Sequence, residues 1–80
     1  MVLIVKRLED FKQCLKYARY PLYRIIEHED VVEVRVKAGR IGWEGTFKKD
    51  DPRLQEFRKL LETYGGVEVK DAKPDELFLG

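Results

Sequence analysis

Few residues in this 80-residue sequence are equipped for catalysis. The chain contains no serine, one cysteine (Cys14) and one histidine (His28). Acyl transfer needs a nucleophile beside a base, as in Ser/His or Cys/His arrangements, and the chain has almost no material for either. Cys14 falls on the apolar side of a predicted helix, where we interpret it as a small core residue. The sequence therefore predicts a protein that is not an enzyme, with no catalytic residues and no cofactor.

His28 is the residue best placed for metal binding or proton transfer. Neighbouring carboxylates at Glu27, Glu29 and Asp30 would keep its imidazole charged. Acidic hairpin tips are usually solvated turns, and we prefer that interpretation. No Cys/His pair has metal-ligand spacing, so we predict no metal site. The segment GRIGWEG (39–45) contains three glycines but opens a strand rather than a helix, so it lacks the context of a phosphate-binding loop.

The elements that position these residues are organised around residues 22–48, whose pattern predicts three antiparallel strands. Two-residue turns at Glu29-Asp30 and Gly39-Arg40 set a register that places Ile25 opposite Val34 and Val34 opposite Gly45. One face then carries the predicted core: Tyr23, Ile25, Val32, Val34, Val36, Ala38, Ile41, Trp43 and Phe47. Gly45 leaves a gap in that face, where we expect a helix to approach closely.

The flanking segments complete an α+β domain. Residues 2–6 are apolar and β-branched, which predicts a buried strand. Apolar spacing predicts helices over 8–19 and 52–64, the first stopped by Pro21 and the second capped by Asp51 and ended by Gly65. A strand over 67–70 is expected to pair with the first one. The predicted order is β-α-β-β-β-α-β in one domain over 1–80, a ferredoxin-like variant with two helices on one face of a mainly antiparallel sheet.

Basic residues gather on the opposite face of the predicted sheet. Arg24 lies opposite Arg35 in this register, with Lys37 diagonal to them. The set of candidate nucleic-acid contacts is Arg24, Arg35, Lys37, Arg40 and Lys48. An open sheet face with basic side chains can follow a phosphate backbone. The alternative is an ordinary solvated face, because Glu33 and Glu44 interrupt the positive charge and the sheet aromatics point into the core.

A family resemblance supports the nucleic-acid interpretation. The segments LEDFKQCLKYAR and DDPRLQEFRKLLE flank the three-strand meander within residues 8–64. This layout resembles the α-β-β-β-α proteins of the signal recognition particle Alu domain, and a small archaeal/eukaryotic large-subunit ribosomal protein. The resemblance implies RNA binding through the open sheet face, which here carries Arg24, Arg35, Lys37, Lys48 and Arg40.

The C-terminal residues Leu77, Phe78 and Leu79 form an apolar run at a chain end that would normally fray. In the simplest interpretation they fold back to cover the core or the outer-face residues Leu22 and Ile26. Otherwise they form a patch that docks on a partner, most economically a second copy of the chain. The leading hypothesis is thus a non-catalytic binding module associated with RNA or a ribonucleoprotein. The alternative is a homodimeric structural or protein-interaction protein using the sheet face or this tail.

The amino-acid composition indicates the source organism and the cellular location of the protein. Sixteen basic and fifteen acidic residues give a net charge of +1, while 39% of residues are charged. Such charge density, with no serine or asparagine, is typical of hyperthermophile proteins and predicts an archaeal source. No apolar run approaches the roughly 20 residues of a membrane span. The order of residues in MVLIVKR is the reverse of a signal peptide, so we expect a cytoplasmic protein without a membrane partner.

Overall fold

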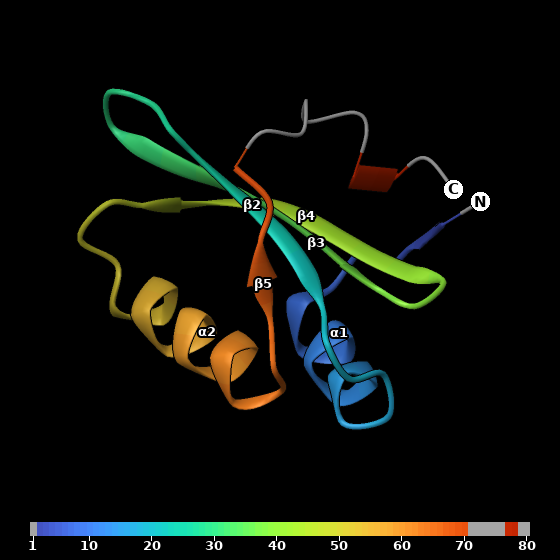
Figure 1. Cartoon of the computed structure of the whole chain (residues 1–80). Coiled ribbons are helices and arrows are strands. Elements are labelled where there is room, and N and C mark those ends of the chain that lie inside the picture. Colours follow the sequence, from blue (N-terminus) through green and yellow to red (C-terminus); the bar gives the residue numbers. More distant parts are fainter. Residues whose placement is uncertain (1, 71–76, 79–80) are drawn as a thin grey trace.

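The computed structural model describes residues 2–70 and 77–78, and within them five strands form one sheet with two helices on a single face (Figure 1). The element order is β1-α1-β2-β3-β4-α2-β5. Their bounds are, in that order, Leu3–Ile4, Leu8–Leu15, Leu22–Glu27, Val31–Ala38, Ile41–Lys48, Pro52–Thr63 and Val67–Glu68. The predicted α+β class and the predicted element order are confirmed.

The central meander β2-β3-β4 has the predicted register. Ile25 lies opposite Val34, and Val34 lies opposite Gly45. Because side chains alternate between the two faces along a strand, this register turns every second meander residue toward the helices. The predicted core residues on that face are all buried or packed against the buried cluster: Tyr23, Ile25, Val32, Val34, Val36, Ala38, Ile41, Trp43 and Phe47.

The edges of the sheet differ from the prediction. The sheet order is β1-β4-β3-β2-β5, so β5 pairs in parallel with β2, and the predicted pairing of β5 with the first strand is wrong. The α2 crossover carries the chain beyond β2, where Val67 N–H donates to Pro21 O at 2.9 Å and Val69 N–H donates to Tyr23 O at 2.7 Å. Next to β5, burial raises the pKa of the Tyr23 hydroxyl, and the Glu68 carboxylate raises it further.

The first strand is also shorter and more exposed than predicted. Only Leu3–Ile4 pair, in parallel with β4, and their exposed fractions are 71% and 41%. Val5, one residue further, is half-buried and packs against the core cluster. The strand lies at the sheet edge, so its outer side has no neighbouring strand among the described residues. The expected buried strand over 2–6 is therefore a two-residue edge strand.

The helices begin as predicted but end earlier. Helix α1 stops at Leu15 rather than at residue 19, and Lys16 N–H donates to Gln13 O in a tightened last turn. Helix α2 is capped by Asp51, whose Oδ1 accepts the backbone N–H of Arg53 at 2.9 Å. The Arg53 side chain and backbone also bind this carboxylate and lower the pKa of Asp51. Gly65 ends the second helical segment with a φ of +76°, as predicted.

The core is centred on three aromatic rings between α2 and the sheet. Phe57 meets the indole of Trp43 edge-on, with ring centroids 5.5 Å apart, and lies 6.3 Å from the ring of Phe47. The indole also occupies the space left by Gly45, where a Cβ would stand 2.5 Å from Trp43 Cζ2. The expectation that a helix approaches Gly45 is thus wrong, because a ring from the same strand fills the gap first.

Candidate nucleic-acid interface

The five predicted basic residues share the outer side of the sheet but do not form one cluster. Arg24 lies opposite Arg35, as predicted. Lys37 lies two residues along β3, opposite Gly42, and Arg40 lies in the β3–β4 turn. Lys48 stands at the other end of β4, six residues from the Gly42 that Lys37 faces, which is about 20 Å along the strand at about 3.4 Å per residue. The predicted cations are therefore spread along the whole face.

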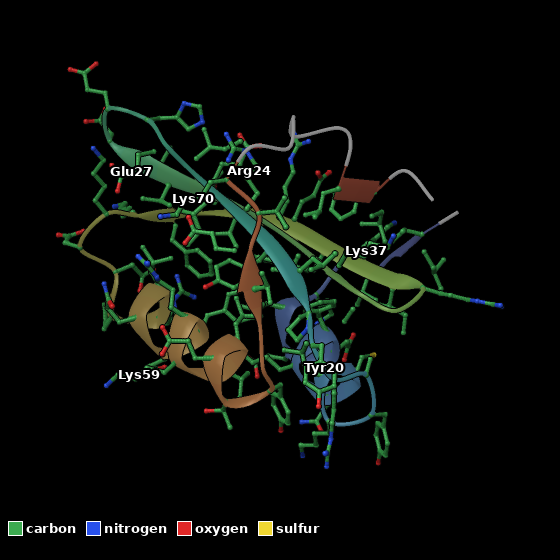
Figure 2. The ribbon with its side chains drawn as sticks, viewed as in Figure 1. Tyr20, Arg24, Glu27, Lys37, Lys59 and Lys70 are labelled. Carbon is green, nitrogen blue, oxygen red and sulfur yellow. The ribbon has the colours of Figure 1, made fainter. Side chains whose placement is uncertain are left out.

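Arg24 is held by the end of the chain segment that follows β5. Its Nη1 donates to Val69 O at 3.3 Å and also to Lys70 O. Figure 2 shows Arg24 and Lys70 close together on this part of the sheet. The Arg24 Nε is buried and has no hydrogen-bond partner within residues 2–70 and 77–78. The Arg24 guanidinium therefore links the segment after β5 to β2, and few of its N–H donors remain to bind a phosphate.

Arg35 is surrounded by carboxylates. Its Nη2 lies 3.0 Å from Glu33 Oε2, and its Nε lies 3.6 Å from Glu44 Oε2. The other Glu33 oxygen, Oε1, is 3.3 Å from His28 Nε2. Glu33, Arg35 and Glu44 line a shallow hollow of about 340 Å³ with Gly45 and Thr46. The centre of the outer face thus carries paired charges of both signs, not a positive patch.

His28 takes part in this network from the β2–β3 end of the sheet. Its side chain is half exposed, and its ring lies beside the Glu33 carboxylate. Across the part of the chain that the structure describes, no three His, Cys, Asp or Glu side chains gather in a way suited to a metal ion. The arrangement is that of an exposed histidine bound to one carboxylate.

Lys37, Arg40 and Lys48 differ from the two central arginines. None of the three has an ion pair with another residue of the described ranges, and Arg40 and Lys48 are exposed. Lys37, labelled in Figure 2, is half-buried on β3. Arg40 follows Lys37 by three residues at the same hairpin end. We name Lys37 and Arg40 the basic rim.

The two described tail residues lie against the chain itself. Leu77 is 5% exposed and does not belong to the helix-side core cluster. A Cβ placed on Gly42 would stand 2.8 Å from Phe78 Cε1 and 2.7 Å from Val2 Cγ1, so both side chains cover Gly42. Gly42 faces outward, so Phe78 folds back on the outer face over Gly42, whereas Leu22, one of the two residues that the tail was expected to cover, is 39% exposed. Leu79 lies outside the described residues. The outer face is consequently not fully open, contrary to the expectation.

Two exposed aromatic residues were not among the predicted contacts. Tyr17 and Tyr20 are 90% and 72% exposed and lie between α1 and β2. The aromatic residues predicted for the sheet, Tyr23, Trp43 and Phe47, belong to the core. The signal that was available is the alternation of basic and aromatic residues in KYARY (16–20) directly before Pro21. These tyrosines are the exposed aromatic side chains of this surface, whereas the sheet aromatics Trp43 and Phe47 are buried.

Fold and surface together define a small α+β domain with a mixed-charge sheet face, a basic rim and exposed tyrosines. Comparison with known proteins identifies no matching family and no matching curated protein. Neither helix of the described chain has the length and apolar character needed to cross a bilayer. The surface chemistry of the chain is therefore the basis on which a function is proposed.

Proposed function

We propose that this chain is a small non-catalytic domain that binds RNA, alone or within a ribonucleoprotein, in the cytoplasm of a hyperthermophilic archaeon. The observation that supports the proposal is the basic rim. Lys37 and Arg40 lie at one hairpin end, without an ion-pair partner in the described chain. Lys48 adds a third exposed cation at the far end of β4, where its charge also acts on the Asp51 carboxylate. Cations that are not neutralised internally release counterions when they meet phosphates, and this drives nucleic-acid binding.

The proposal predicts weak, salt-sensitive binding to a short RNA hairpin with an unpaired loop. Three phosphate contacts give a slope of log affinity against log salt of about −2. Exchanging both rim residues (Lys37→Glu with Arg40→Glu) should lower the affinity about tenfold or more at about 50 mM salt and flatten this slope. Fluorescence anisotropy of labelled RNA across a salt series measures both quantities.

Lys59→Glu makes half of this charge change, −2 against −4, on α2, on the opposite side of the sheet (Figure 2), so it is the matched control for Arg40→Glu alone. It is expected to leave most of the affinity intact, because α2 lies on the other face of the sheet from the rim (Figure 1) and salt screens the interaction between separated exposed charges. An equal loss of affinity in Lys59→Glu would mean that the net charge of the protein, and not the position of the rim, determines binding. Absence of binding by the unmodified chain, or binding that does not weaken with salt, would refute the proposal.

A second candidate function, a homodimeric interaction protein, is favoured by the exposed edge strand β1. Leu3 is 71% exposed and Ile4 is 41% exposed, whereas Leu77 of the tail is buried within its own chain. Two copies of β1 can pair about a two-fold axis and cover these side chains. Light scattering should then give a dimer for the unmodified chain and a monomer for Leu3→Lys. A monomer for both, at every concentration, contradicts this candidate.

A further inference from the structure

A cleft lies beside Tyr20, which Figure 2 labels at the helical end of the molecule. Its lining comes from two segments, the one between α1 and β2 and the C-terminal end of α2. The lining residues are Arg19, Tyr20, Glu62, Thr63, Tyr64 and Gly65. The volume of about 410 Å³ falls within the range of about 300–1,000 Å³ that is usual for sites of small ligands. We name it the Tyr20 cleft.

The backbone of Tyr20 is held in an unusual conformation. Its φ is +61°, and no other described residue apart from glycine has a positive φ. For a bulky residue this left-handed conformation is strained, and such strain is found where the surrounding structure fixes a residue for a function. The fixing interaction is visible, because Tyr20 N–H donates to Tyr64 O at 2.8 Å.

The ring of Tyr20 is fixed as well as its backbone. A Cβ on Gly65 would stand 2.7 Å from Tyr20 Cδ1, so the ring lies against bare glycine backbone. The side chain is nevertheless 72% exposed. An aromatic ring that is supported on one side and open on the other loses little conformational freedom when a second flat ring stacks on it. The ring is thus prepared for stacking before any ligand arrives.

One basic residue lines the cleft, and the turn that carries Arg40 of the basic rim packs beside the same segment. Arg19 lines the cleft, and Lys16 lies three residues before it; both are exposed. The β3–β4 turn packs against the same segment, since a Cβ on Gly39 would lie 3.9 Å from Ala18 Cβ. Arg40 is the next residue in that turn. Arg19 therefore places a cation in an aromatic cleft, and Arg40 lies in a turn that packs beside the same segment. Aromatic rings next to cations are the composition of sites that bind unpaired nucleotides.

We infer that the Tyr20 cleft binds one unpaired base of an RNA strand, and this inference rests on the function proposed above. The base stacks on the open side of the Tyr20 ring, with Tyr64 on the other wall of the cleft. Arg19 binds the adjacent phosphate as a charge-assisted hydrogen-bond donor. The Glu62 carboxylate accepts an N–H from the edge of the base. From the cleft the strand continues toward Arg40, so that the cleft and the basic rim contact one RNA.

The test uses the full chain and a short RNA loop with a single 2-aminopurine, whose fluorescence falls when the base stacks. Binding to the unmodified chain should quench this fluorescence. Tyr20→Leu should abolish the quenching and weaken binding about tenfold, which is the loss expected for one stacked base. Tyr20→Phe keeps the ring and should retain both the quenching and the affinity.

Tyr17→Leu is the matched control, because it removes an even more exposed tyrosine that does not line the cleft. It should retain the quenching. A second measurement needs no variant. Ultraviolet cross-linking of the complex with the unmodified chain should attach the nucleotide to the peptide that contains Tyr20. Circular dichroism of each variant reports whether its fold is intact.

The outcomes separate this inference from the function on which it rests. If the unmodified chain binds no RNA, both fail. If it binds RNA but Tyr20→Leu retains full quenching, or the cross-link falls on another segment, the cleft assignment alone fails. Equal loss of quenching in Tyr17→Leu would also overturn the assignment, because the signal would then come from general aromatic exposure.

Discussion

Replacing Phe57 by alanine is expected to lower the free energy of unfolding by about 3–5 kcal/mol. The Phe57 side chain is fully buried and contacts the rings of Trp43 and Phe47 across the α2–sheet interface. Removing the ring of Phe57 leaves a cavity beside the rings of Trp43 and Phe47, and these rigid groups cannot move to fill it. Since small domains have total stabilities of about 5–15 kcal/mol, the variant should be close to unfolding. Urea denaturation followed by circular dichroism measures the loss.

The control for Phe57→Ala is Tyr17→Ala, which removes an aromatic ring that is 90% exposed. Exposed substitutions of this kind change stability by about 0.5 kcal/mol or less. A loss below about 1 kcal/mol in Phe57→Ala would mean that the α2–sheet interface repacks freely, which contradicts a core built on three interlocking rings. A large loss in Tyr17→Ala would instead place that residue in a packed site.

The meander was predictable because local constraints determine it. Two-residue turns join the strands, and a slip of one residue would expose Val34 and bury Arg35. The edges of the sheet were not predictable in the same way. Strands β1 and β5 contribute only Leu3–Ile4 and Val67–Glu68, and their partners lie across helical crossovers. Two-residue pairings over such distances depend on where the helices pack, which single-sequence periodicity does not report.

The candidate interface was predictable in position, and in charge around Arg35, but the partners of Arg24 were not predictable. The register correctly placed Arg24 opposite Arg35. However, Glu33 lies two residues from Arg35 on the same face, and Glu44 lies directly across from it, so their pairing follows from the same register. That Arg24 bonds to the backbone after β5 depended on the strand partner that was wrongly predicted. The local sequence pattern determines the strand position of each charged residue. Whether its charge is free to bind a phosphate depends on tertiary contacts.

The Tyr20 cleft was missed because the end of α1 carries no strong local signal. Residues 16–19 are compatible with a helix, and the first strong stop is Pro21. In the structure α1 ends at Leu15, and the segment that follows is held by the bond from Tyr20 to Tyr64. That bond joins residues 44 positions apart in sequence. The site therefore results from the packing of two helix ends and depends on a conformation that no local preference favours.

Replacing Gly45 by valine is expected to lower the free energy of unfolding by about 1–3 kcal/mol. A Cβ at this position would stand 2.5 Å from Trp43 Cζ2 and 2.6 Å from Cη2. The indole cannot retreat, because it is 6% exposed and Phe57 packs edge-on against it. Valine is the better strand former by up to about 1 kcal/mol, so a measured loss means that steric overlap outweighs intrinsic preference. Urea denaturation of the variant gives the value.

A double-mutant cycle with Trp43→Phe tests the cause of this loss. Phenylalanine lacks the Cζ2 and Cη2 atoms that the new side chain would meet, so Gly45→Val should cost less in the Trp43→Phe background, by about 0.5–3 kcal/mol of coupling. Thr46→Val is the matched control, since Thr46 is exposed on the outer face of the same strand. It should be neutral or slightly stabilising. Equal losses from Gly45→Val in both backgrounds would show that the backbone at position 45, and not the Trp43 ring, requires glycine. The contact between the indole and Gly45 would then contribute nothing to the stability of the core.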